Sequence, residues 1–189
     1  MFNEEQVENG VKMILEGIGE DLKREGLRET PKRVTKMYKE VFEGINYSNT
    51  EIADMFNKTF HENNCKDIIV MKNIPCFSFC EHHMALMYNM KVSVGYIANG
   101  KVIGLSKIAR IVDMVCKRLQ IQERIAYDVY DVLNKILNTE NIIIYIQAEH
   151  SCMTVRGVKK QGEVTTSVYK NGLFKDKMYI DEFFNIIDR

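Results

Sequence analysis

Cys80-Glu81-His82-His83 is the stretch from which the rest of the sequence can be understood, and a second cluster, His150-Ser151-Cys152, follows far downstream. Zn²⁺ favours thiolate and imidazole ligands, and a catalytic zinc takes three protein ligands and keeps a fourth position for water. Cys80, His83 and Cys152 would make such an open site. Because only the fold can bring Cys152 to the other two, the sequence predicts a tertiary structure in which these segments meet.

His82 and His150 remain beside this predicted zinc site. Three of the chain's four histidines lie in the two clusters. An imidazole that titrates near neutral pH can move protons during a reaction. The alternative is a buried free cysteine among surface histidines, since cysteine is one of the most buried residue types even where it has no chemical role.

The length and the charge of the chain narrow its class. With 189 residues and a mass of 22.0 kDa, the chain fits one domain. A core of that size needs no metal for its stability, which favours a catalytic zinc over a structural one. The 26 basic and 26 acidic residues give a formal net charge of +0. We therefore expect no nucleic-acid partner and no anionic membrane surface, and any anion site must be local.

The cysteine count and the first residues predict a cytoplasmic protein. The five cysteines are an odd number, and Met1-Phe2-Asn3-Glu4-Glu5 lacks the basic and apolar regions of a secretion signal. This combination is typical of reduced thiols rather than of a disulfide framework. No run approaches the roughly 18 apolar residues that a membrane span requires.

Strands are predicted on both sides of the cysteine-histidine pair. The first is β-branched and should end at Pro75, directly before Cys80. Asn99-Gly100 is a strong hairpin signal, so the strands around it should be antiparallel. An almost continuously apolar stretch later in the chain would deliver His150 and Cys152 at its end. The predicted strands cover residues 68–74, 90–96, 101–104, 141–148 and 164–169.

Helices are predicted where apolar residues recur at helical spacing behind a capping residue. Asn3, Thr30 followed by Pro31, and Ser106 are good starting signals. The expected helices cover residues 3–18, 30–43, 51–57, 106–119, 122–137 and 181–187. We interpret residues 1–189 as a single α+β domain in which helices cover an antiparallel sheet. Its parts are a mainly helical N-terminal segment, residues 1–60, and a core, residues 66–189.

Two pairs of basic residues could bind phosphate. Lys107 and Arg110 lie near a predicted helix start, where free N–H groups favour an anion. Arg33 and Lys36 lie off the apolar stripe of their helix. The alternative for both pairs is an ordinary solvated helix face.

Five stretches, in this order along the chain, resemble GTP cyclohydrolase I over nearly its whole length. They are Glu25-Gly26-Leu27-Arg28-Glu29-Thr30-Pro31, Cys80-Glu81-His82-His83, Val102-Ile103-Gly104-Leu105-Ser106-Lys107, Gln122-Glu123-Arg124 and Arg156-Gly157-Val158. The resemblance implies a tunnelling fold and an enzyme that converts GTP and water to formate and dihydroneopterin triphosphate. It also implies a homo-oligomeric ring, commonly a decamer, with active sites between subunits.

The resemblance assigns a role to each motif residue. Cys80, His83 and Cys152 match zinc ligands, in agreement with the spacing argument. His82 and His150 match catalytic histidines that protonate N7 of guanine and shuttle protons. Glu123 matches the residue that reads guanine, supported by Gln122. The residues that match ribose and triphosphate contacts are Ser106, Lys107, Arg110 and Arg156, and Ser106 is also assigned to the catalytic group. Arg33 and Lys36 fit a phosphate role less closely.

Some positions depart from the family pattern. Residues 84–90 lack a proline and a glycine that are common there, and Leu22 replaces a common proline. Cys65, Cys76 and Cys116 match no family function, although Cys76 could be a fourth ligand. Two competing functions are a zinc-stabilised module that binds a purine nucleotide without turnover and a different tunnelling-fold enzyme.

Overall fold

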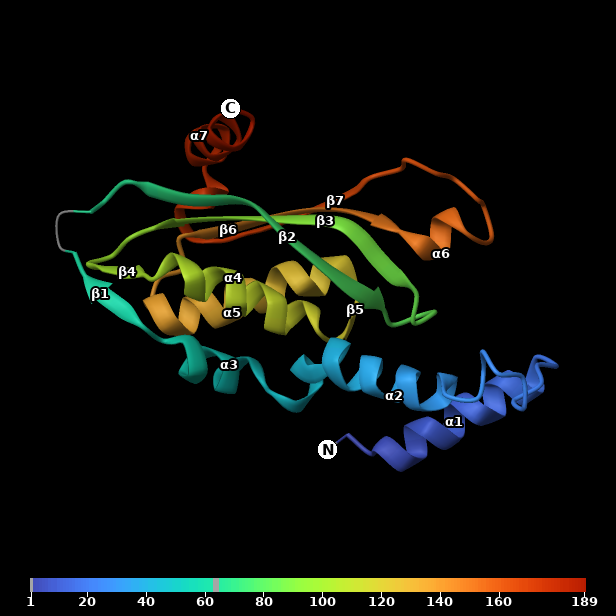
Figure 1. Ribbon diagram of the computed structural model, residues 1–189. Helices are drawn as coiled ribbons and strands as arrows, with labels where there is room; N and C mark the ends of the chain where they lie inside the picture. Colours follow the sequence, from blue (N-terminus) through green and yellow to red (C-terminus); the bar gives the residue numbers. More distant parts are fainter. Residues whose placement is uncertain (1, 63–64) are drawn as a thin grey trace.

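The computed structural model describes residues 2–62 and 65–189 and shows a curved sheet with helices against it (Figure 1). The helices are α1 (Glu4–Gly17), α2 (Thr30–Val41), α3 (Asn49–Phe56), α4 (Leu105–Cys116), α5 (Gln122–Leu137), α6 (Ser151–Thr154) and α7 (Lys177–Ile187), with short 3-10 helices η1 (Glu43–Asn46) and η2 (Gly172–Lys175). The strands are β1 (Thr59–His61), β2 (Ile68–Cys80), β3 (Leu86–Ile97), β4 (Lys101–Ile103), β5 (Leu119–Gln120), β6 (Ile142–His150) and β7 (Thr165–Lys170).

Five strands form the main sheet in the order β5-β2-β3-β6-β7. β2, β3, β6 and β7 pair antiparallel, as predicted, whereas the short β5 joins β2 in parallel. A separate two-stranded sheet pairs β1 with β4, so the hairpin predicted at Asn99-Gly100 is wrong: β4 turns away from β3 to pair with β1. The α+β class and the helix-covered sheet are thus confirmed, and the parallel edge strand is an addition to the prediction.

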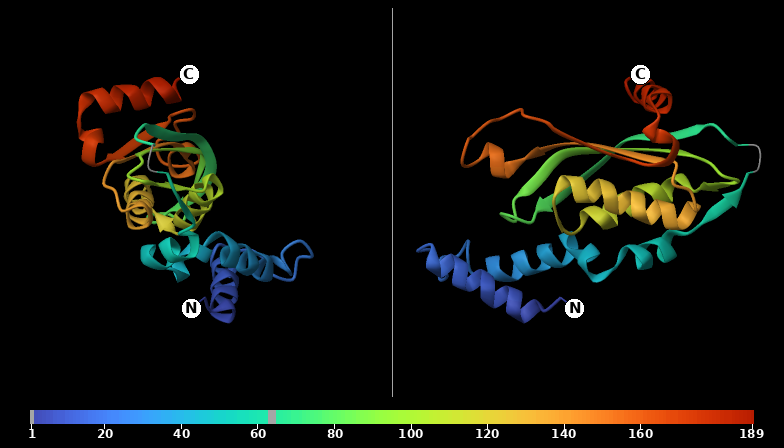
Figure 2. Two further views of the ribbon diagram at one scale, coloured as in Figure 1. Left: turned by 90° about the vertical axis from the view of Figure 1, so that its left-hand side faces the viewer. Right: turned by 180° about the vertical axis from the view of Figure 1, so that it is seen from behind.

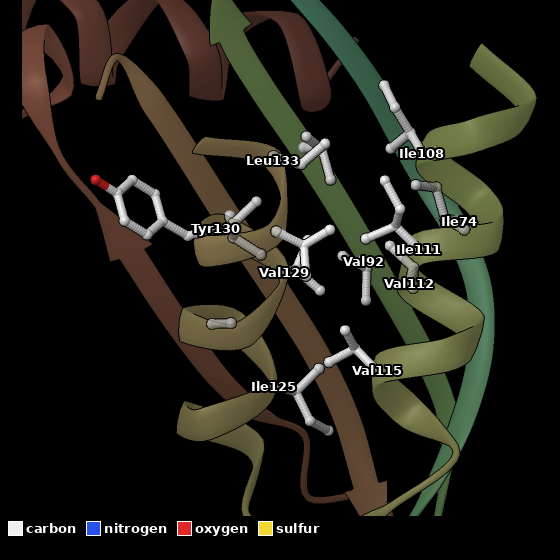
Figure 3. Packing of buried hydrophobic residues seen from close by; sticks show 14 of the residues in the cluster. Ile74, Val92, Ile108, Ile111, Val112, Val115, Ile125, Val129, Tyr130 and Leu133 are labelled. Atoms are coloured by element: carbon white, nitrogen blue, oxygen red, sulfur yellow. The ribbon is translucent and has the colours of Figure 1, made fainter. Parts of the chain in front are cut away.

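The core lies between one face of the sheet and the helices α4 and α5 (Figure 3). Ile111 and Val115 of α4 face Ile125 and Val129 of α5, and all four are 0% exposed. Their spacing of four residues on each helix is the helical periodicity visible in the sequence. The two helices therefore lie along the strands and fix the ends of β2 and β6 relative to each other.

The opposite face of the sheet is covered at one end by α7 (Figure 1). Phe183 of α7 packs with Ile97, Ile143 and Phe174 in a second apolar cluster. Gly95 permits this contact, because a Cβ at that position would lie 2.7 Å from the ring of Phe183. The helix begins at Lys177, capped by Asp176, four residues before the predicted start.

Pro75 does not end β2, contrary to the prediction. The strand continues to Cys80, and Pro75 pairs in register with Lys91 of β3. On its other side β2 pairs only with β5, at Phe79 and Cys80. Proline lacks an N–H donor but is tolerated at a strand edge that has no neighbour there. β2 therefore runs unbroken to the predicted metal pair.

Ser106 is not the cap of its helix, also contrary to the prediction. α4 begins at Leu105 with Gly104 as the N-cap in an extended conformation. The carbonyl of Gly104 accepts a hydrogen bond of 2.8 Å from the N–H of Lys107. Ser106 therefore already lies in the first turn of the helix. The start of α2 is shifted likewise, with Glu29 as the N-cap and Thr30 as the first helical residue.

The N-terminal segment is helical as expected, and Asn3 caps α1 by accepting the N–H of Gln6. α1 and α2 pack together beside the core, whereas α3 packs against α5 (Figure 2). Sequence patterns missed the short elements β1, β5, α6, η1 and η2. Among residues 2–62 and 65–189, every helix is too short or too polar to cross a bilayer.

Candidate active site

A tight turn after β2 shapes the first half of the site. The N–H of Cys80 donates to the carbonyl of Ala85 at 2.8 Å, and the N–H of Met84 donates to the carbonyl of Cys80 at 2.9 Å. Met84 adopts a left-handed backbone with φ of 50°, so the chain reverses without the glycine that the family pattern suggested. The turn directs Cys80 and His83 to the same side, with 4.0 Å between Sγ and Nδ1.

The second half arrives through the register of the sheet. Met87 of β3 lies opposite His150 at the end of β6, and α6 follows at once and carries Cys152. Ligand atoms of Cys80, His83 and Cys152 all lie within 4.8 Å of one another. The predicted meeting of the two distant clusters is therefore confirmed, while the role of these residues as ligands stays a prediction.

The surroundings of Cys152 favour its neutral thiol. Partial burial raises the pKa of the Cys152 thiol, and the nearby Cys80 raises it further, whereas Arg156 acts in the opposite direction. A divalent cation would reverse this balance because it stabilises both thiolates. Two sulfurs and one imidazole nitrogen at this spacing fit Zn²⁺ by donor type and by number.

Arg156 contacts this group through His83. Its guanidinium donates to Nε2 of His83 at 2.7 Å. Since arginine has no acceptor, Nε2 must carry the lone pair and the ring proton lies on Nδ1, facing Cys80. A metal bound at Nδ1 requires the opposite tautomer, so the contact with Arg156 and metal binding at Nδ1 exclude each other.

His150 is held by the buried amide of Gln122. The two side chains are joined by a hydrogen bond of 2.8 Å between His150 Nε2 and Gln122 Oε1. Burial lowers the pKa of His150, and the charge of Glu123 partly offsets that effect. The neutral imidazole is therefore favoured, which suits a group that accepts and returns a proton.

Arg124 fastens the turn to the start of α5, a role that sequence patterns did not reveal. Its guanidinium donates to both carboxylate oxygens of Glu81, at 2.6 and 3.1 Å. This hydrogen bonding holds the pKa of Glu81 below its usual value. Both residues stand inside recognised motifs, but no local pattern pairs positions so far apart.

Glu123 and His82 are exposed at the same end of the molecule. Glu123 lies in the first turn of α5, next to Gln122. Its carboxylate makes no hydrogen bond or salt bridge in the part of the chain that the structure describes. The rings of His82 and His83 are 6.4 Å apart between centroids.

Ser106, Lys107 and Arg110 lie at the other end of the sheet. They occupy the first turns of α4, beside β4 and the Ile97 end of β3, whereas the last residue of α4 accepts a hydrogen bond from Ser78 of β2 at 2.7 Å. Figures 1 and 2 both show α4 running between these two ends. A single subunit therefore does not bring these residues to Cys80.

Arg33 and Lys36 are exposed on α2. Neither forms a hydrogen bond or a salt bridge with the Cys80 group among the described residues. The helix approaches β2 through its C-terminal end, where the rings of Phe42 and Phe79 are 5.2 Å apart. A phosphate contact from this pair stays a prediction.

Comparison with known proteins gives a consistent result. The family model for GTP cyclohydrolase I matches residues 7–188. A protein of Clostridium botulinum (strain Loch Maree / Type A3) named GTP cyclohydrolase 1 is 53% identical over 173 residues, covering 89% of this chain and 88% of its own. A protein of the same name from Clostridium acetobutylicum is 52% identical, covering 90% of this chain and 89% of its own. Another from Ruminiclostridium cellulolyticum is 53% identical, covering 92% of each chain.

Proposed function

The chain belongs to the GTP cyclohydrolase I family, and we propose that the group around Cys80, His83 and Cys152 is its active site. The activity is that of a hydrolase, which converts GTP and water to formate and 7,8-dihydroneopterin triphosphate, a step of pterin and folate synthesis. The observation that carries the proposal is the convergence of two thiols and one imidazole within 4.8 Å, with His150 beside them.

Cys80, His83 and Cys152 would hold Zn²⁺ as the cofactor. Bound there, zinc would act as a Lewis acid that activates water for attack on C8 of guanine. The support is the donor set itself: thiolate and imidazole select zinc over the hard cations that prefer oxygen. Arg156 must leave His83 before it can contact the triphosphate. Binding of zinc at Nδ1 of His83 requires the same departure.

His150 and His82 would handle protons while the purine ring opens. Attack at C8 develops charge on the ring, and protonation at N7 neutralises it. His150 is suited to this because burial favours its neutral form and because a hydrogen bond fixes its ring. His82 is exposed in the turn and can reach a docked nucleotide without rearrangement of the sheet.

Glu123 would select guanine. One carboxylate accepts hydrogen bonds from both the ring N–H and the exocyclic amino group of guanine, and adenine does not offer that pair of donors. The position of Glu123 supports this role, since it is exposed in the first turn of α5 and free of protein hydrogen bonds among the described residues.

A second subunit would complete the site. Ser106, Lys107 and Arg110 begin α4, and a helix of 12 residues is about 18 Å long at 1.5 Å per residue. Their cationic groups suit a triphosphate, but in one chain they lie at the far end of the sheet. We propose a ring of subunits, a decamer as in the family, in which these residues face the Cys80 group of a neighbour. The five free cysteines fit a cytoplasmic location.

Incubation of the purified, zinc-loaded protein with GTP tests the function. We expect release of formate together with a product that becomes fluorescent as an oxidised pterin. Zinc-loaded protein that binds GTP without forming either product would contradict the enzyme and favour a nucleotide-binding module. Native mass measurement of the assembly tests the ring separately.

A further inference from the structure

We propose that Gln122 is a positioning residue that fixes the tautomer of His150 and does not contact guanine itself. The inference rests on the proposed function of His150 and concerns the side chain that holds it. Gln122 is the first residue of α5 and only 2% exposed. It connects this helix with β6, β7 and the histidine at the end of β6.

The orientation of the amide is decided by two carbonyl groups. The Nε2 atom of Gln122 donates to the carbonyl of Ile146 at 3.2 Å and to that of Thr165 at 3.0 Å. A flipped amide would place its oxygen against both carbonyl oxygens, with no hydrogen in either contact. The oxygen must therefore face His150, where it can only accept.

This orientation determines which ring nitrogen of His150 carries a hydrogen. Because Oε1 of Gln122 is an acceptor, Nε2 of His150 must donate across the 2.8 Å between them. The lone pair of the neutral ring is then on Nδ1. Proton exchange with the substrate consequently takes place at Nδ1, and Gln122 keeps that nitrogen available.

The same contacts argue against a direct role of Gln122 in binding the base. Both N–H groups of its amide are used by backbone carbonyls, and its oxygen is used by His150. Its burial leaves almost no surface for a nucleotide. Recognition of guanine is then assigned to the neighbouring Glu123 alone, and Gln122 influences the rate through His150.

The tautomer can be measured directly. Zinc-loaded protein labelled with ¹⁵N in its histidine rings would be studied by solid-state NMR, which distinguishes protonated from unprotonated ring nitrogens and suits a large assembly. We expect His150 to show a protonated Nε2 and an unprotonated Nδ1 without substrate. The opposite tautomer in the unaltered protein would overturn the proposal, whether or not the protein releases formate from GTP.

Two variants separate the acceptor from the donors of the amide. Gln122→Met removes the acceptor and the donors, so the ring proton of His150 should be distributed over Nδ1 and Nε2. The value of kcat should fall by about 10²-fold, the low end of what acid–base groups contribute. KM for GTP should stay within about twofold of its original value, since the base contact is left intact. Gln122→Glu keeps an acceptor and should retain the tautomer.

Gln120 provides a matched control for loss of a buried amide. It is 1% exposed, and its Nε2 donates to Asp128 at 2.9 Å, but it does not touch His150. Gln120→Met should lower stability by an amount similar to Gln122→Met while leaving the His150 tautomer unchanged. A tautomer that stays unchanged in Gln122→Met, or a rise in KM without a fall in kcat, would refute the positioning role.

Discussion

Two polar clusters join distant segments of this protein, one around Arg118 and one around Cys80. In the Arg118 cluster, the guanidinium donates to Asp128, to Asn49 and to the carbonyls of Gly44 and Tyr47, at 2.8 to 3.1 Å. In the Cys80 cluster, defined as Cys80, His83 and Cys152, electron-pair donors face one another. The first cluster contains its own cation, whereas the second is a group that could hold one.

The difference separates a polar cluster whose charges are satisfied within the fold from one that could bind a metal ion. The charges of Arg118 and Asp128 are mostly buried, with side chains 15% and 11% exposed, and each is satisfied by its partners. In the Cys80 cluster, partial burial and then the nearby Cys80 raise the pKa of Cys152. A bound cation would stabilise the Cys152 thiolate that these surroundings disfavour.

Cys152→Ser should have the largest effect on function. A serine hydroxyl is a poor zinc ligand, so bound zinc and formate release should both be lost while the fold persists. Zinc analysis and circular dichroism would measure this, with Cys65→Ser as a control that keeps its metal. Full zinc occupancy in Cys152→Ser would remove this residue from the ligand set and abolish the contrast between the clusters.

Arg118→Met should have the largest effect on stability. It leaves the Asp128 carboxylate without its guanidinium partner, and removal of one partner of a buried pair costs about 3–5 kcal/mol of unfolding free energy. Denaturant unfolding would show this, with zinc content per folded chain unchanged. Lys177→Met is the control, because that ion pair is exposed (88% and 55%) and should contribute only about 0–1 kcal/mol.

Arg156→Ala sharpens the comparison because this arginine, unlike Arg118, is proposed to serve a ligand. Loss of a charge-assisted hydrogen bond should weaken GTP binding about 10- to 100-fold. Guanosine, which lacks the phosphates, should bind almost unchanged in competition assays. Zinc affinity should hold or rise, since the contact with His83 Nε2 is removed; equal losses for GTP and guanosine would contradict the assignment.

Glu4→Gln should have the smallest effect, since the ion pair between Glu4 and Lys39 is exposed on both sides. The hydrogen bond from Lys39 lowers the pKa of Glu4. Its stabilising contribution is therefore present above the ordinary carboxyl pKa and is lost as the pH falls through the lowered value. The difference in melting temperature between Glu4→Gln and the original protein should be small at pH 7 and vanish once the pH is below the lowered pKa of Glu4. A difference that grew on acidification would contradict this.

Sequence patterns predicted most of the long elements, because their causes are local. The apolar stripes of α4 and α5 and the cap at Asn3 depend on residues within a few positions of one another. Pro75 misled the prediction for β2, since its effect depends on whether a neighbouring strand exists on that side. The two-residue β5 and the single turn of α6 carry too few residues to show any periodicity.

The candidate site was predicted by residue type and by the meeting of its two clusters, whereas the contacts around that meeting point were not. Spacing and family resemblance selected Cys80, His83 and Cys152, and their meeting in space agrees with that selection. Neither the pair of Glu81 and Arg124 nor the direction of the Gln122 amide leaves a local trace. The same is true of the separation between Ser106 and Cys80 within one chain.

The sequence by itself determined the chemistry: which donors, acids and cations the protein has, and the helices and strands that local periodicity produces. Only the tertiary structure decided which of them act together. The pairing of Met87 with His150 brings Cys152 to Cys80, and two backbone carbonyls orient the amide of Gln122. Such contacts depend on strand register and on helix packing between remote segments, and a shift of one residue in β6 would send His150 to the other face of the sheet.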